Sequence, residues 1–132
     1  MSSSGSRYVI IDTSVFLLIR DKYDVLTSLR EDLEEHLECA TTDSVVRELI
    51  STAIRSGEQL ILEYLKKIFE KCMIFTLSED LEREEADHDL LLVAKILDAP
   101  LLTLDKDLKR EARKERIRMI IYRGSDKRIV SP

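Results

Sequence analysis

Four acidic residues that lie far apart in the sequence occupy positions at which their carboxylates could meet. Each stands directly after a predicted strand or in the first turns of a predicted helix: Asp12, Glu48, Asp87 and Asp105. Carboxylates that share one site repel one another unless cations neutralise them. A ligand set made only of oxygen, without Cys or His, favours hard cations such as Mg²⁺ and Mn²⁺. One or two such ions can orient a water, lower its pKa and stabilise charge on a phosphodiester.

Hydroxyl and acidic neighbours could hold these carboxylates in place or act as alternative ligands: Thr13, Ser14, Asp89, Thr103 and Asp107. Each of the four acids also has a purely structural explanation. Asp12, Asp87 and Asp105 could be capping or dipole-stabilising acids at helix starts, and Glu48 could be an exposed acid in an ion pair. Each explanation accounts for one position and none for all four, so their joint placement favours a shared site.

Strands and helices alternate along the chain, and this alternation decides where the acids lie. Short apolar runs rich in β-branched residues predict strands at 8–11, 37–41, 73–77, 101–104 and 118–122. Helical spacing and capping residues predict helices over 15–19, 25–37, 45 to the break at Gly57, 58–71, 87–98 and 105–116. The order indicates an α/β protein whose parallel sheet has helices on both faces. Ligands of such sheets bind beyond the carboxyl ends of the strands.

The 132 residues carry a net charge of −5 that conceals a polarised distribution. Residues 79–89 hold seven acids, whereas 106–118 hold seven bases. A solvated helix face would give this pattern, and so would an anionic substrate held beside a cation pocket. If the basic part contacts an RNA backbone, the residues concerned are Lys106, Lys109, Arg110, Arg113 and Arg123. We expect a disordered lead-in over 1–6 and a single domain over 7–132.

Several classes of protein find no support in the composition. No apolar run approaches the roughly 18 residues of a membrane span, so we expect no membrane partner and a cytoplasmic location. Cys39 and Cys72 indicate a reduced, intracellular chain, although one disulfide is compatible with the sequence. Three glycines form no nucleotide-binding loop. The only two histidines, His36 and His88, provide no credible partner for a Ser or Cys nucleophile.

The segments YVIIDTSVF, TTDSVVREL, ADHDLLLVAKILDAPLLTLDKDL and RIRMIIYRG resemble the PIN-domain ribonucleases in order and spacing, over roughly residues 8 to 123. In that family an Asp ends the first strand and a Glu sits in the helix after the second. A later Asp opens a helix sixteen residues before the Thr of a T-x-D motif. Asp12, Glu48, Asp87 and Asp105 match these four positions, with Thr103 as the Thr. His88 and Asp89 depart from the family's simpler acidic pair, so either Asp87 or Asp89 could be the ligand.

The resemblance implies a three-layer α/β/α fold with a five-stranded parallel sheet, Mg²⁺ or Mn²⁺ held by the four acids, and endonucleolytic cleavage of single-stranded RNA. The PIN nucleases of ribosomal RNA processing share the TLDKDL motif, the basic helix and the IIYRG ending, and we favour this branch, with an rRNA precursor as substrate. The toxins of VapBC toxin–antitoxin pairs have a similar size and imply a homodimer and an antitoxin as partners. A catalytically inactive PIN fold that binds RNA or protein is a third hypothesis, and the retained acids count against it.

Overall fold

The computed structural model describes residues 7–77 and 86–131, apart from the side chain of Ala86. The predicted lead-in at 1–6 lies outside the described residues. None of the helices described is long and apolar enough to cross a membrane.

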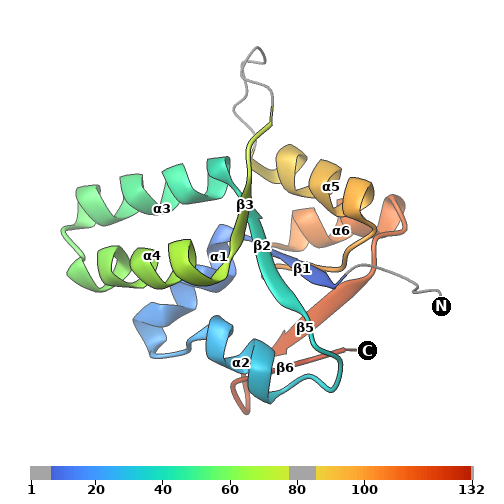
Figure 1. Ribbon diagram of the computed structural model, residues 1–132, viewed down its shortest axis with the longest axis horizontal. Helices are drawn as coiled ribbons and strands as arrows, with labels where there is room; N and C mark the ends of the chain where they lie inside the picture. Colours follow the sequence, from blue (N-terminus) through green and yellow to red (C-terminus); the bar gives the residue numbers. More distant parts are fainter. Residues whose placement is uncertain (1–6, 78–85, 132) are drawn as a thin grey trace.

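Within these residues six strands form one sheet in the order β3-β2-β1-β4-β5-β6 (Figure 1). Five of them run parallel: β1 (Tyr8–Ile11), β2 (Glu38–Thr42), β3 (Met73–Phe75), β4 (Leu101–Leu102) and β5 (Met119–Arg123). The chain builds β1, β2 and β3 outward in one direction and then returns to place β4 on the other side of β1. A crevice for ligands is expected at such a switch point, beyond the carboxyl ends of β1 and β4.

The sixth strand, β6 (Arg128–Val130), pairs antiparallel with β5 and was not predicted. It has three residues and follows a tight turn in which Lys127 has a φ of 51°. A strand this short shows no alternation that a sequence pattern can detect. The predicted five parallel strands are confirmed, and the full sheet is one strand larger and mixed in direction.

Helices cover both faces of the sheet, as the alternating sequence predicts. They are α1 (Thr13–Phe16), the 3₁₀ helix η1 (Leu17–Asp21), α2 (Val25–Glu31), α3 (Asp43–Ser56), α4 (Gln59–Lys71), α5 (Ala86–Leu97) and α6 (Lys106–Lys114). Figure 1 shows α3 and α4 on one side of the strands and α5 and α6 on the other. The three-layer α/β/α arrangement is therefore confirmed.

The helix predicted over 25–37 ends early, at Glu31. The next residue, Asp32, turns its carboxylate to the backbone N–H of Ile129 at 3.1 Å and so ties this segment to β6. Leu37 reaches the core from the extended chain just before β2, not from a helix. Its helical spacing from Leu29 and Leu33 was therefore misleading.

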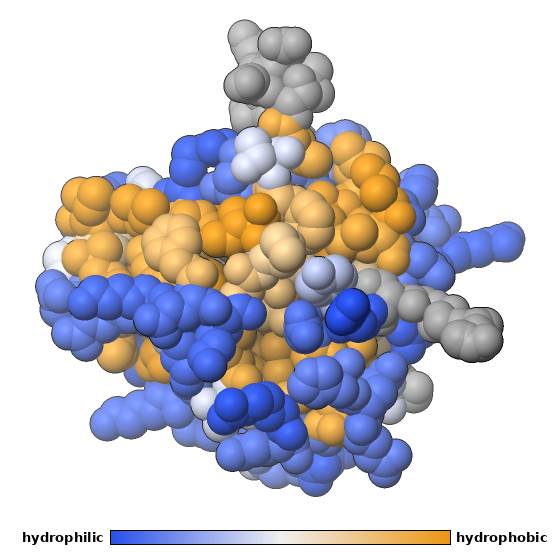
Figure 2. Space-filling model, viewed as in Figure 1, coloured by the Kyte–Doolittle hydropathy of each residue, from blue (hydrophilic) through white to orange (hydrophobic). Residues whose placement is uncertain are grey.

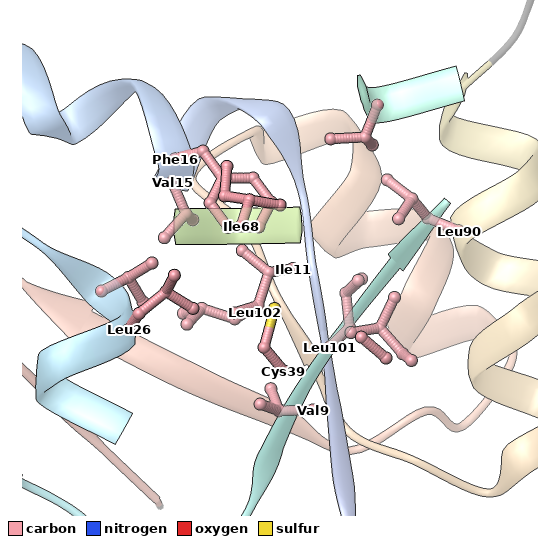
Figure 3. Packing of buried hydrophobic residues seen from close by; sticks show 14 of the residues in the cluster. Val9, Ile11, Val15, Phe16, Leu26, Cys39, Ile68, Leu90, Leu101 and Leu102 are labelled. Atoms are coloured by element: carbon pink, nitrogen blue, oxygen red, sulfur yellow. The ribbon is translucent and has the colours of Figure 1, made fainter. Parts of the chain in front are cut away.

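The core lies between the sheet and its helices. Val9, Ile10 and Ile11 of the central strand have no exposed surface, nor have Leu101 and Leu102. Figure 3 shows side chains from β1, β4 and the covering helices packed together. Tight packing around β1 and β4 fixes the positions of the residues that directly follow these two strands.

Cys39 and Cys72 form a disulfide, so the prediction of two reduced thiols is wrong. Cys39 lies in β2 and Cys72 directly precedes β3, and the parallel register that pairs Ala40 with Met73 also brings the two cysteines opposite each other. Their Cα atoms are 4.6 Å apart. The pairing depends on β2 and β3 being neighbours, which sequence spacing alone does not show. The cytoplasmic location stays a prediction.

Large apolar side chains are exposed on part of the surface. Figure 2 shows apolar surface over α3, α4 and α5 in the upper half of this face. Among residues 7–77 and 87–131, the exposed large apolar residues are Ile54, Leu60, Leu62, Phe69, Met73, Leu92 and Ile96. The homodimer that the resemblance implies stays a prediction.

Candidate functional site

Asp12 is fixed at the switch point between β1 and β4. It follows β1 directly, and only 6% of its surface is exposed. One carboxylate oxygen, Oδ2, accepts hydrogen bonds from Ser14 Oγ at 2.8 Å and from Thr103 Oγ1 at 2.6 Å. Although Asp12 precedes α1, its side chain makes no capping hydrogen bond. Asp12 is therefore the N-cap residue of α1 by position, but its carboxylate does not cap the helix.

Two hydroxyls are held so that they must donate to Asp12. Ser14 Oγ accepts the backbone N–H of Leu104 at 3.1 Å, and Thr103 Oγ1 accepts that of Asp105 at 3.0 Å. A hydroxyl that accepts an N–H still has one proton to donate, and Asp12 Oδ2 is the acceptor in reach of both. Ser14 and Thr103 thus hold Asp12 Oδ2 in place, while their part in a metal site stays a prediction.

Glu48 is brought to the same edge by Thr13. The side chain of Thr42 accepts the N–H of Val45 at 3.3 Å and begins α3, so Glu48 lies in the second turn of that helix. Glu48 is exposed, and its Oε1 accepts a hydrogen bond from Thr13 Oγ1 at 2.6 Å. Since Thr13 is the neighbour of Asp12, this bond places an acid from α3 beside the carboxyl end of β1.

The structure separates Asp87 from Asp89. Two residues along a helix correspond to roughly 200°, so the two side chains leave α5 on nearly opposite faces. Asp87 is exposed, whereas only 1% of Asp89 is exposed. Asp89 Oδ2 accepts a hydrogen bond from Ser44 Oγ at 2.6 Å, which joins α5 to the first turn of α3. The predicted ligand Asp87 therefore lies on the outer face of α5, and its alternative Asp89 lies on the inner face.

The side chains of Asp105 and Asp107 both interact with groups of α6. Asp105 is exposed, and its Oδ1 accepts the backbone N–H groups of Asp107 at 2.8 Å and Leu108 at 3.0 Å, so it caps the helix. Asp107 forms an ion pair with Arg110 at 3.0 Å. Asp105 is still joined to the Asp12 network through its N–H and Thr103, so it stays at the edge of the site.

Ser44 is a contributor that sequence reasoning missed. It stands beside Thr42 and Asp43, and its residue type predicts only one more helix cap. The cap is Thr42, which leaves the Ser44 hydroxyl to bind Asp89. The available signal was that Thr42, Asp43 and Ser44 are all capping residue types, whereas one helix start needs only one of them.

The donor types fit a hard divalent cation, but the carboxylates do not form a compact cluster. Asp12, Glu48 and Asp89 and the hydroxyls bound to them offer only oxygen atoms, which Mg²⁺ and Mn²⁺ prefer. In the described part of the chain, no Lys or Arg pairs with Asp12 or Glu48. No three acidic, His or Cys residues of 7–77 and 86–131 lie close enough together to hold a metal ion as they stand. Asp12, Glu48 and Asp89 are instead spread along the edge, each bound to a hydroxyl.

The predicted RNA-binding residues extend from the same edge. Lys106 begins α6 directly after Asp105, and Lys109 and Arg113 follow along this helix. Arg110 is paired with Asp107, and Arg123 at the end of β5 is paired with Asp126 at 2.9 Å. Because β5 is parallel to β4, the carboxyl end of β5 lies at the same edge of the sheet as Asp12. Basic groups therefore flank the acids, although two of the five already have acidic partners.

Comparisons with known proteins identify the fold. No protein-family model matches the sequence, and none of the curated proteins matches it either. Among solved structures, the PIN domain endonuclease Utp24 superposes with a TM-score of 0.73 at 21% identity, over 95% of this chain and 92% of that one. A PilT N-terminus domain protein from Sulfolobus solfataricus has a TM-score of 0.55 at 20% identity, over 86% of each chain. A domain of a functionally unknown protein from Methanocaldococcus jannaschii also has 0.55, at 21% identity, over 88% of this chain and 91% of that one.

Proposed function

We propose that this chain, which has the PIN-domain fold, is an endonuclease that hydrolyses phosphodiester bonds of single-stranded RNA with the help of Mg²⁺ or Mn²⁺. One observation carries the proposal. A buried carboxylate, Asp12, is held by two hydroxyls at the switch point of a parallel sheet, and acids from α3 and α5 lie along the same edge. The PIN domain endonuclease Utp24 supports the reaction class, because its fold resembles that of this chain over almost its whole length.

Asp12, Glu48 and Asp89 are the residues that would hold the ion. Ser14 and Thr103 occupy Oδ2 of Asp12, while Oδ1 has no hydrogen-bond partner among the described residues. Among the described side chains, only the hydroxyl of Tyr23 is both fully buried and without a hydrogen-bond partner. Since Asp12 Oδ1 has no partner either, it must reach solvent. The network thus fixes one oxygen of Asp12 and presents the other. When bound, such an ion lowers the pKa of a water and stabilises negative charge on the phosphate.

The basic residues of α6 would position the RNA backbone. Lys106, Lys109 and Arg113 extend away from the carboxyl edge along α6, and cations placed this way can contact successive phosphates. An rRNA precursor as substrate is supported by the resemblance of TLDKDL, the basic helix and IIYRG to rRNA-processing PIN nucleases. The VapBC alternative predicts the same chemistry at the same residues and differs in requiring an antitoxin.

The first test is Mn²⁺ titration by calorimetry on the wild type, on Asp12→Asn and on Glu70→Gln, each followed by cleavage of a single-stranded RNA. Glu70 is an exposed acid of α4 and serves as the matched loss of one charge. We expect the wild type and Glu70→Gln to bind Mn²⁺ and to cut RNA, and Asp12→Asn to do neither. RNA binding that persists in EDTA and in Asp12→Asn, without any product, would instead support the inactive binding module.

The second test compares Asp89→Asn with Asp87→Asn. Both changes remove one negative charge from the same turn of α5, but only Asp89 faces inward. We expect Asp89→Asn to weaken Mn²⁺ binding and cleavage strongly, and Asp87→Asn to leave both close to wild type. The opposite ranking would show that the exposed acid is the ligand and would refute the assignment of Asp89.

A further inference from the structure

A hollow lies at the amino ends of the strands, the end of the sheet opposite to the acids. It has a volume of about 360 Å³ and is lined by residues of α2, the start of β2 and α4. Glu38 and Cys39 are the first residues of β2, whereas Asp12 and Glu48 lie beyond the carboxyl ends of the strands. The hollow therefore belongs to the amino edge and is separate from the candidate active site. Its volume falls at the lower end of the range of small-molecule pockets.

The floor of this hollow is apolar. Leu26 and Leu29 of α2, together with Leu37, are each no more than 7% exposed. Cys39 also lines the hollow and is 3% exposed. Figure 3 shows Leu26 on α2 and Cys39 on the sheet. An apolar body of a ligand would be removed from water here, which is favourable in proportion to its buried area.

The rim of the hollow is basic. Arg30, His36 and Lys71 line it and are exposed, and none of them has an acidic partner within the described residues. Lys67, the third Lys or Arg residue that lines the hollow, is paired with Asp24. The one acid on the rim is Glu38. In a chain with 26 acids and 21 Lys and Arg residues, a local excess of positive charge around an apolar floor is the charge pattern that attracts an anion.

From this combination we propose that the hollow binds a small amphiphilic organic anion, with its carboxylate or phosphate head at the basic rim and its alkyl or aromatic body on the leucine floor. The guanidinium of Arg30 and the ammonium of Lys71 approach the head group from α2 and α4 respectively. A ligand held in this way bridges the two helices. The site involves neither the acids nor the metal of the proposed nuclease reaction.

The probe is octanoate, which has a carboxylate head and an apolar body short enough for this volume. It is titrated into the whole 132-residue chain, with the disulfide intact, while ¹H–¹⁵N NMR spectra are recorded. Acetate, which has the head alone, and 1-octanol, which has the body alone, are the matched probes. We expect octanoate to shift amides of α2, of the start of β2 and of α4 in a saturable way. Each matched probe should bind at least about tenfold more weakly, a difference of roughly 1.4 kcal/mol.

The rim variants are Arg30→Gln, Lys71→Gln and the double variant that combines them. Lys66→Gln is the control, on the same helix α4 as Lys71. Lys66 is exposed on α4 and does not line the hollow. We expect each rim change to weaken octanoate binding about fivefold, the upper end for an exposed ion pair, and the control to leave it unchanged. The absence of saturable shifts in the folded wild type would overturn the proposal. It would also be overturned if 1-octanol bound as tightly as octanoate, or if the double variant bound like the control. Asp12→Asn should not affect this binding, so failure here is distinguishable from failure of the nuclease proposal.

Discussion

Replacing Thr103 by Val tests whether the hydroxyl network holds Asp12. Thr103 is 2% exposed, and Val has nearly the same shape, so the change removes hydrogen bonds without opening a cavity. Two bonds are lost: the one to the Asp12 carboxylate at 2.6 Å and the one from the N–H of Asp105 at 3.0 Å. A hydrogen bond to a charged group contributes about 2 kcal/mol and a neutral one about 1 kcal/mol, so we expect a loss of about 3 kcal/mol.

Urea unfolding followed by circular dichroism measures this loss. With a slope of about 2 kcal/mol per molar urea, the midpoint should fall by about 1.5 M. Thr103→Ser keeps the hydroxyl and should lose only about 1 kcal/mol for the missing methyl group. In an Asp12→Ala background the cost of Thr103→Val should fall to about 1 kcal/mol, since only the bond from Asp105 remains to be lost. A Val variant as stable as the wild type would refute the idea that this hydroxyl supports the carboxylate.

Three further predictions concern stability away from the site. Replacing Cys39 and Cys72 by Ala should lower the free energy of unfolding by about 4 kcal/mol, the chain-entropy value for their separation of 33 residues; urea unfolding measures it, with added reductant as a check on the wild type. Burial raises the pKa of the Asp24 carboxyl, but hydrogen bonds from Lys67 and Tyr64 outweigh it and hold that pKa below its usual range. The stability that Asp24 contributes should therefore be complete above about pH 4 and be lost as pH falls through the lower folded-state pKa; Asp24→Asn should flatten this part of the pH profile of unfolding. Gly57→Ala should cost about 1 kcal/mol in thermal unfolding, since the residue has a φ of 68° but no neighbour within 4 Å of an added Cβ.

The strands that carry the site could be predicted because their sequences are simple. Residues 8–11 form an apolar run in which Val9, Ile10 and Ile11 are β-branched, and a parallel sheet buries such a strand on both faces. The end of this apolar run is enough to place Asp12 at the carboxyl edge of the sheet. Thr103 was linked to it through the resemblance and through its position at the end of another apolar run.

The orientation of side chains on α5 could not be predicted. Asp87 and Asp89 differ by about half a turn, and the decision between them depends on which face of α5 packs on the sheet. That face is set by contacts with β1 and β2, which are distant in sequence. The burial of Leu90, Val93 and Ala94 on this face rotates Asp89 inward and Asp87 outward.

Two other features were missed because they depend on neighbouring strands. The cysteine pair needs β2 and β3 side by side, and β6 needs β5 as a template. Asp105 shows the converse case, in which a local explanation was correct: it caps α6 as a residue before KDLKREARK would be expected to. Its role as a metal ligand stays a prediction.

The disulfide also changes how the molecule is connected. Together with the backbone from 39 to 72 it closes a covalent ring that contains α3, α4 and the turn at Gly57, with the rest of the chain leaving as two arms. Glu48 belongs to the ring, Asp12 to the amino-terminal arm and Asp89 to the carboxyl-terminal arm. A protease that cuts once at the Gly57 turn therefore opens the ring but releases no fragment, and the three acids remain on one covalent molecule until a reductant divides it in two.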